Sequence, residues 1–300
     1  MLSQKLQEGN YLTLETTPLK LPRLDPILKK LEESGAVELV DGFTTTDSPL
    51  SQPKYNSIIA AYRLQQRFGK PVIATVTMRD RNWIALQGDL LAANDLGVTH
   101  ILALTGDPIK MARIPAKGVF EGNSLKLLEL IQNFNRGVDL GGEPFKIPPT
   151  PITPFGVTGS VIKNRERFKK KIRAKLERGA VGVITQPVYS VEQARSLLEV
   201  MEEVWEEMGE RKGELILGFF PITSLKTALF LQKGVPGVEV PQSIVEELER
   251  ANRKGEERKR GVQLSRDLFG QLWELHPKIH FMCANRFELV PEIVGEVKGN

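Results

Sequence analysis

The chain has 300 residues, of which 41% are hydrophobic, and it contains thirteen Phe and three Trp. A chain of this size and composition buries a large core in one or two globular domains. Its apolar runs are shorter than the roughly 18 residues that a membrane span needs. The N-terminus MLSQKLQEGN lacks the apolar centre of a signal peptide. We therefore expect a cytoplasmic protein with no membrane partner.

Charge and cysteine content exclude several further classes. The 41 basic and 37 acidic side chains leave a formal net charge of +4, too small to indicate a nucleic-acid partner. Cys283 is the only cysteine, so neither an intrachain disulfide nor a thiolate metal site can form. The three His are scattered without metal-ligand spacing, so we expect no metal. No glycine-rich dinucleotide or P-loop motif occurs.

Eight apolar segments of strand character alternate with segments of helical periodicity along the chain. The predicted strands are Tyr11–Thr16, Val37–Val40, Pro71–Met78, His100–Leu104, Phe155–Ile162, Val181–Val188, Leu215–Pro221 and Ile279–Cys283. This alternation predicts a parallel sheet, and eight units in one chain predict a closed (βα)8 barrel. A doubly wound open sheet is the competing topology. No shift in composition marks a linker, so we expect residues 1–300 to form a single barrel domain.

Two segments interrupt the alternation. Residues 136–154 contain three Gly and five Pro, a composition that predicts a long loop and could accommodate an active-site excursion. Residues 242–275 carry helical periodicity without a strand, which predicts a helical extension before the last strand.

The active site of a parallel barrel lies at the carboxyl ends of its strands. The polar residues at or just past predicted strand ends are Glu15, Asp41, Thr44, Thr45, Thr46, Thr77, Asp107, Thr158, Gln186, Asn285 and Arg286. Each by itself is equally compatible with a helix cap or a loop ion pair, and Gly106-Asp107 alone favours a turn. Glu15 is the sharpest candidate, because it lies inside an otherwise apolar and hydroxylic strand.

A run of cations between Lys163 and Lys175 could suggest a polyanion partner. Phe168, Ile172 and Leu176 give the same segment an ordinary buried stripe, so a solvated helix face is the better interpretation.

Five segments, YLTLETTP, HILALTGDP, GVITQPVY, LGFFPITS and HFMCANR, resemble in this order the methylenetetrahydrofolate reductases, flavin-dependent (βα)8 enzymes of one-carbon metabolism. The resemblance covers nearly the whole chain. It implies hydride transfer from reduced FAD to the methylene carbon of methylenetetrahydrofolate, or of a related pterin, in the supply of methyl groups for methionine biosynthesis. The electron donor would be NAD(P)H, another reductant or an electron-donor protein, and we expect a homo-oligomer.

The resemblance also implies roles for individual residues. Glu15 would be the general acid that assists opening of the folate ring, and Asp107 would lie beside the flavin and the pterin. Gln186 would bind flavin and folate, and an amide suits the mixed donors and acceptors of a pterin edge. Phe219 or Phe220 would stack against the substrate or nicotinamide.

The resemblance further implies that Arg286 binds an acidic group of the substrate. Thr105, Gly106 and Asp107 would contact the cofactor, as would Asp41, and Lys175 would lie near the flavin phosphates.

The chain departs from part of the family at three positions, with Thr75 in place of His, Thr105 in place of Arg and Phe168 in place of an acid. These departures leave flavin binding open. The alternative hypothesis is therefore a folate-binding or electron-transfer-dependent subunit that needs a partner protein. A barrel aldolase would need a Lys inside a strand, and the predicted strands contain none.

Overall fold

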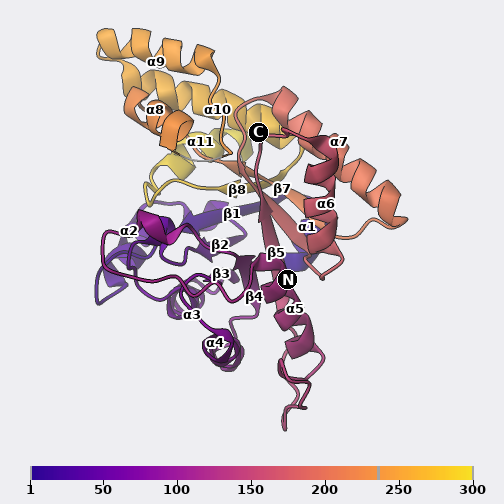
Figure 1. The fold of residues 1–300 in the computed structure, drawn as a ribbon. Coiled ribbons are helices and arrows are strands. Elements are labelled where there is room, and N and C mark those ends of the chain that lie inside the picture. The colour runs from indigo at the N-terminus through magenta and orange to yellow at the C-terminus, as the bar shows by residue number, and fades with distance from the viewer. Residues whose placement is uncertain (1, 235–236, 299–300) are drawn as a thin grey trace.

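The computed structural model describes residues 2–234 and 237–298 and contains a closed barrel of eight parallel strands in chain order (Figure 1). The strands are β1 (Tyr11–Thr16), β2 (Gly42–Thr45), β3 (Val72–Thr77), β4 (His100–Leu104), β5 (Thr153–Thr158), β6 (Gly182–Pro187), β7 (Glu214–Phe219) and β8 (Lys278–Phe281). β1 pairs with both β2 and β8, which closes the barrel. The predicted (βα)8 barrel is confirmed, and the doubly wound alternative is wrong.

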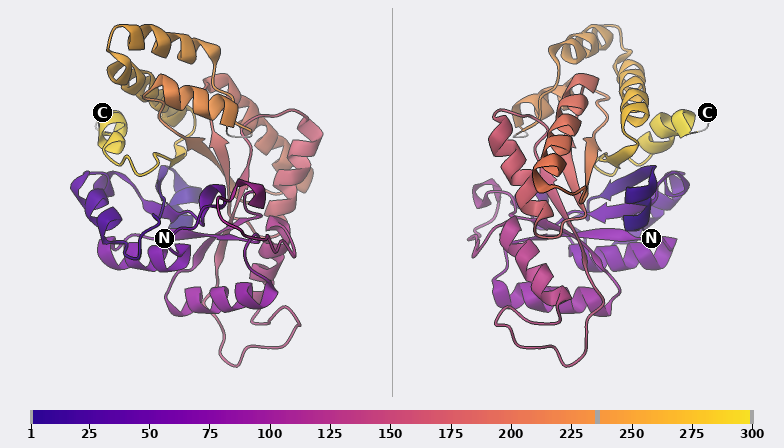
Figure 2. Two further views of the ribbon diagram at one scale, coloured as in Figure 1. Left: turned by 60° about the vertical axis from the view of Figure 1, so that its left-hand side comes forward. Right: turned by 90° about the vertical axis from the view of Figure 1, so that its right-hand side faces the viewer.

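Helices cover the outside of the barrel (Figures 1 and 2). They are α1 (Leu2–Glu8), α2 (Asp25–Glu33), α3 (Ser57–Phe68), α4 (Trp83–Asp95), α5 (Ser124–Asn135), α6 (Arg165–Leu176), α7 (Val191–Met208), α8 (Leu225–Gly234), α9 (Gln242–Arg253), α10 (Glu257–Leu275) and α11 (Leu289–Lys298). Short 3-10 turns are η1 (Val37–Leu39), η2 (Pro49–Ser51) and η3 (Ile109–Met111). Within the described ranges, none of the helices combines the length and apolar character needed to cross a bilayer.

The tract predicted as a helical extension consists of two helices, α9 and α10, that meet at Gly255. Gly255 has a φ of +71°, a left-handed conformation that ends α9 and lets the chain reverse. Val245 and Leu248 of α9 pack with Leu231 of α8 in a separate apolar cluster. Figure 1 shows α8, α9 and α10 together at one side of the barrel.

The second strand differs from the sequence prediction. Residues 37–40 were expected to form it, but Val37–Leu39 is the 3-10 turn η1 and the strand is Gly42–Thr45. Gly42 pairs with Thr13, and the Thr45 hydroxyl donates to the Ser57 carbonyl at 2.9 Å. The threonines look like loop residues in the sequence, yet they are β-branched and fit a strand whose hydroxyls find backbone acceptors.

The long loop between α5 and β5 lies at the amino ends of the strands, because each helix of the barrel runs back from the carboxyl ends. It is held by Asn135, whose side chain accepts from the Ile152 amide and donates to the Ile152 carbonyl, both at 2.7 Å. In the structure this segment is a loop as far as β5, and it lies at the opposite end from the barrel mouth.

The interior of the barrel changes character along its axis. At the amino ends of the strands it is filled by Tyr11, Ile73 and Phe155, all fully buried, and α1 covers this end with Leu2 and Leu6. At the carboxyl ends polar side chains such as Glu15, Thr75 and His280 join apolar ones in the lining of a cavity. The amino end is therefore part of the core, and the carboxyl end is open to ligands.

Candidate active site

A cavity of about 420 Å³ opens at the carboxyl ends of the strands. Its lining includes eight of the candidate residues that the sequence singles out: Glu15, Thr44, Thr46, Thr77, Thr105, Gly106, Asp107 and Gln186. They come from β1, β2, β3 and β6 and from the loops after β2 and β4. Parallel strands bring their carboxyl ends to one face, so residues far apart in sequence meet here.

Glu15 lies at the end of β1 with its side chain toward this cavity. Burial raises its pKa from the ordinary 4.5 to about 7. Within residues 2–234 and 237–298, no side chain or amide donates a hydrogen bond to its carboxylate. A carboxyl group with this pKa and no partner holds a proton near neutral pH and can donate it to a bound molecule.

Asp107 follows β4 in a tight turn. Its Oδ2 accepts a hydrogen bond of 2.6 Å from the Leu50 amide, and the Ser51 hydroxyl donates to the Pro108 carbonyl at 3.1 Å. The turn needs Gly106, which has a φ of +97°, because a Cβ there would come within 2.7 Å of the Arg79 Cβ. The loops after β2, β3 and β4 therefore hold the Asp107 carboxylate in a fixed position at the mouth.

Left-handed backbone at non-glycine residues occurs, within the described ranges, at the carboxyl side of the barrel. Among the described residues, the non-glycine positions with positive φ are Ser48, Leu50, Ser51, Phe120, Ala284 and Asn285. All six lie in loops at the carboxyl side of the barrel, after β2, β4 and β8. Left-handed backbone is costly for side-chain-bearing residues and clusters at functional sites, where surrounding contacts enforce it.

A second cavity of about 750 Å³ adjoins the mouth and shares Thr105, Val157 and Gln186 with it. Lys175 lies at its inner side with 8% of its surface exposed, and its Nζ donates to the Lys171 carbonyl at 3.3 Å. Burial, and secondarily Lys171, lower the pKa of Lys175. The lysine stem crosses Gly156, where a Cβ would be 2.8 Å from the Lys175 Cδ. Among the described residues no carboxylate pairs with Lys175, so we treat this cavity as a candidate anion-binding site.

A family model described as methylenetetrahydrofolate reductase matches residues 3–298. The chain belongs to the methylenetetrahydrofolate reductase family.

Two solved structures with the same fold are distant in sequence. An uncharacterized protein from Clostridium thermocellum, described as binding two copies of 5-methyl-5,6,7,8-tetrahydrofolic acid, has a TM-score of 0.67 and 16% identity. The match covers 100% of this chain and 99% of that one. DmoA from Hyphomicrobium sulfonivorans has a TM-score of 0.58 and 12% identity, covering 97% of this chain and 88% of that one. No curated protein matches the chain.

Four residues expected at the reductase site lie elsewhere, and Asp41 is the clearest correction. It precedes β2, and its Oδ2 accepts from the Leu12 amide at 2.8 Å while Lys5 binds Oδ1 at 2.5 Å. These contacts are at the amino end of the barrel. The expectation of a cofactor contact was wrong because the strand was placed before Asp41 rather than after it.

Phe219 and Phe220 also lie outside the mouth. The Phe219 side chain is fully buried, with its ring centroid 5.3 Å from Phe269 of α10 and 5.2 Å from Phe281. It points to the helical layer, so in this structure it is a core residue and not a stacking surface for substrate. Phe220 packs with the α8–α10 cluster, and its carbonyl accepts from the Tyr189 hydroxyl at 3.1 Å.

Arg286 follows β8 and donates to the Thr223 hydroxyl at 2.6 Å, which joins the loops after β7 and β8. It does not line the 420 Å³ cavity. Its neighbour Asn285 accepts from the Thr17 amide at 2.9 Å and donates to the Thr17 carbonyl at 2.7 Å. The Asn-Arg pair thus organises the loops around Glu15 without entering the cavity.

Three ionisable residues of the mouth are missing from the sequence-based set of site residues. Asp47 is buried and accepts from the Thr77 hydroxyl at 3.0 Å and from Arg81 at 2.6 Å. Arg79, with 2% exposure, donates to the Ser48 carbonyl at 3.0 Å. Correct placement of β2 would have identified Asp47 as a strand-end acid, and Arg79 follows β3 directly.

His280 is the third mouth residue that the sequence-based set lacks. It lies in the cavity wall with its Nδ1 2.9 Å from the Thr13 hydroxyl, and burial lowers its pKa to about 4. It is therefore neutral at physiological pH and contributes a polar but uncharged group. Its inward direction follows from strand register, which the sequence does not specify.

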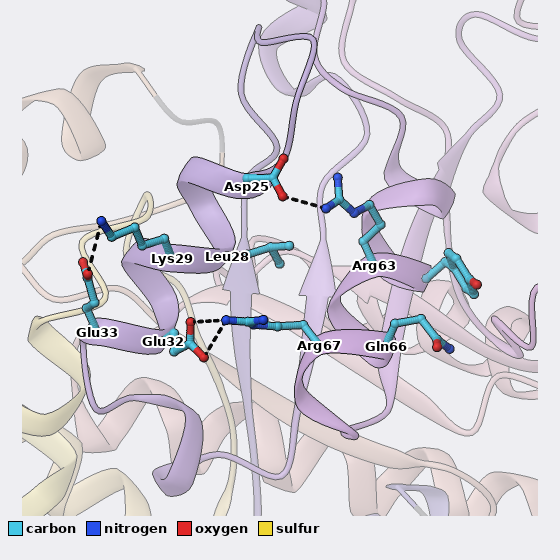
Figure 3. Close-up of a pocket in the computed structure, with 9 residues that line it drawn as sticks. Asp25, Leu28, Lys29, Glu32, Glu33, Arg63, Gln66 and Arg67 are labelled. Atoms are coloured by element: carbon cyan, nitrogen blue, oxygen red, sulfur yellow. Dashed lines mark hydrogen bonds and ion pairs between the residues drawn. The ribbon is translucent and has the colours of Figure 1, made fainter.

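A hollow of about 780 Å³ between α2 and α3 carries many charges but belongs to the surface (Figure 3). Arg63 pairs with Asp25 at 2.8 Å, and Arg67 pairs with Glu32 at 2.6 Å. The side chains neutralise one another across the hollow, so we assign it no ligand.

Proposed function

We propose that the protein reduces methylenetetrahydrofolate, or a related methylene-pterin carrier, to the methyl form with a hydride from reduced FAD. The observation that carries the proposal is Glu15, which is partly buried, has a pKa of about 7 and has no described partner. It shares its cavity with Asp107 and Gln186. Membership of the methylenetetrahydrofolate reductase family supports the choice of substrate.

The residues of the cavity have complementary tasks in this reaction. Glu15 donates the proton that accompanies opening of the five-membered folate ring to an iminium, which then accepts hydride. Gln186 offers both a donor and an acceptor to the pterin edge. Asp107, fixed by the Leu50 amide, presents a carboxylate beside the ring system. The reaction needs one proton donor at the mouth, and Glu15 has the pKa for it.

The two adjoining cavities fit a dinucleotide such as FAD. The smaller one opens at the carboxyl ends of the strands and has both polar and apolar lining, and the lining of the larger one includes Lys163, Arg167, Lys171 and Lys175. Lys175 would offset phosphate charge, and the mouth would hold the ring system with Thr105, Gly106 and Gln186. Bound FAD would supply the hydride, with NAD(P)H, another reductant or an electron-donor protein as its source.

A second candidate function is folate binding without flavin, in a subunit that depends on a partner protein. One observation favours it. The Clostridium thermocellum structure is described as binding two copies of 5-methyl-5,6,7,8-tetrahydrofolic acid, and the match with this chain covers 99% of that structure. The two cavities could hold two folates here as well. Thr105 and Phe168, which differ from part of the family, line the larger cavity.

A flavin titration separates the two candidates. The purified protein is titrated with FAD, reduced chemically under anaerobic conditions and mixed with methylenetetrahydrofolate. We expect saturable FAD binding and reoxidation of the flavin by the folate, while buffer without folate leaves it reduced. A protein that binds 5-methyltetrahydrofolate but no FAD would reject the reductase and support the second candidate.

A further inference from the structure

Arg79 is a buried cation in the wall of the mouth cavity. It lies just after β3 and lines the 420 Å³ cavity, yet only 2% of its surface is exposed. Taking a guanidinium out of water is costly unless its donors find acceptors. Its Nε and Nη2 donate to the two carboxylate oxygens of Asp80 at 2.7 and 2.5 Å. The Asp80 side chain is 40% exposed, so this pair alone does not explain why the arginine lies inside.

The remaining side of the guanidinium faces the loop after β2. Its Nη1 donates to the Ser48 carbonyl at 3.0 Å and lies 3.4 Å from the Ser51 hydroxyl oxygen. Ser48, Leu50 and Ser51 have φ values of 46°, 55° and 54°. Left-handed backbone is costly for such residues and persists only where surrounding contacts enforce it. Arg79 supplies contacts of this kind at both ends of the left-handed segment.

This left-handed segment is also the part of the loop that binds Asp107. The Leu50 amide donates to Asp107 Oδ2 at 2.6 Å, and the Ser51 hydroxyl lies 3.3 Å from the Asp107 carbonyl oxygen, to which it donates. The backbone angles of the segment set the direction of the Leu50 N–H. The contacts of Arg79 with Ser48 and Ser51 therefore determine where the Asp107 carboxylate is held.

Arg79 contacts the loop after β4 as well, which is the loop that carries Asp107. Gly106 lies directly over the arginine, because a Cβ at Gly106 would be 2.7 Å from the Arg79 Cβ. Farther along the same loop, the Val119 amide donates to the Arg79 carbonyl at 2.7 Å. Arg79 thus touches both the loop that bears Asp107 and the loop that donates to its carboxylate.

We propose that Arg79 is a positioning residue for Asp107, which it fixes at the pterin by holding the loops after β2 and β4 together. This inference deepens the proposed function and rests on it. The effect is indirect, since no hydrogen bond joins Arg79 to Asp107 among the described residues and the Leu50 amide lies between them. Loss of the guanidinium should free the left-handed segment and move the carboxylate away from the ligand.

Calorimetric titration with 5-methyltetrahydrofolate tests the proposal in a double-mutant cycle. We expect Arg79→Gln to weaken binding about tenfold, as loss of one polar contact with the ligand would, and Asp107→Ala to weaken it to a similar extent. The double variant should bind no more than about twofold more weakly than Asp107→Ala alone. One residue that acts through another gives such non-additive losses, whereas general destabilisation does not.

The matched control is Arg266→Gln. Arg266 lies on α10, where it donates to the Glu292 carbonyl at 2.8 Å and pairs with Glu296 at 2.9 Å. It loses the same kinds of contact outside the cavity, so folate binding should stay unchanged. Arg79→Lys keeps the charge but not the planar fork of donors, and it should still bind folate more weakly than the unmodified protein.

Additive losses in the double variant would overturn the proposal, as would normal folate binding by Arg79→Gln or Arg79→Lys. Urea denaturation of each variant shows that it is folded under the conditions of the titration. If Arg79→Gln does not fold, the same cycle is measured with Arg79→Lys. Normal folate binding by Asp107→Ala would reject this inference and leave the folate site standing, whereas an unmodified protein that binds no folate would reject the proposed function itself.

Discussion

The two ends of the barrel each contain an acid on or next to a strand, and the two acids are in opposite situations. Asp41 at the amino end has an amide and a lysine as partners, and it lies beside a plug of apolar side chains. Glu15 at the carboxyl end has no described partner and a pKa raised to about 7. An acid that accepts hydrogen bonds, such as Asp41, holds the backbone in place. A buried acid without hydrogen-bond donors, such as Glu15, keeps its proton near neutral pH and can donate it to a bound molecule. We therefore expect substitutions at the amino end to change stability and substitutions at the carboxyl end to change the proposed reaction.

The strongest test of this division is Glu15→Gln. Loss of the acid should lower folate reduction by roughly 10²–10⁴-fold, the contribution typical of a general acid, and leave flavin reduction by the electron donor largely unchanged. Stopped-flow measurement of the two half-reactions separates these effects. Unchanged folate turnover in the variant would remove Glu15 from the catalytic role.

At the amino end of the barrel, Phe155→Ala should lower the free energy of unfolding and leave folate affinity unchanged. The side chain is fully buried in the plug, and deletion of a buried aromatic ring costs about 3–5 kcal/mol of the free energy of unfolding. Urea denaturation measures the loss. Affinity for folate at low temperature, where the variant is still folded, serves as the control and should stay within about twofold. A weakened folate affinity with full stability would contradict the division between the two ends.

The pH dependence of stability gives a smaller effect with a definite sign. Since the pKa of Glu15 rises from 4.5 to about 7 on folding, the folded protein binds more protons than the unfolded chain between these values. The contribution of Glu15 to stability is therefore greatest at low pH and is lost as the pH rises through this window, by about 1–3 kcal/mol. The urea concentration at the midpoint of unfolding should fall between pH 5 and pH 8, and it should fall more for the unmodified protein than for Glu15→Gln. Parallel curves for the two proteins would show that Glu15 has an ordinary pKa.

Several site residues can be predicted from the sequence because their signals are local. Glu15, Asp107 and Gln186 each come at the end of a strand whose apolar pattern is clear, and parallel strands necessarily end at one face. Asp47 and Arg79 belong to the same face but were missed. The β2 strand is rich in threonine, so it resembles a loop, and its misplacement also put Asp41 at the wrong end.

The sequence by itself determined the eightfold alternation, the closed barrel, the family and the acid of β1, because periodicity and short motifs depend on neighbouring residues. Only the tertiary structure decided which way each side chain faces. Phe219 turns into the helical layer, whereas His280 turns into the cavity, since strand register sets their directions. It also decided which cations of α6 are neutralised, because the glutamate that pairs with Lys169 and Arg173 lies on another helix. Pairing across such distances depends on packing, which no local pattern encodes.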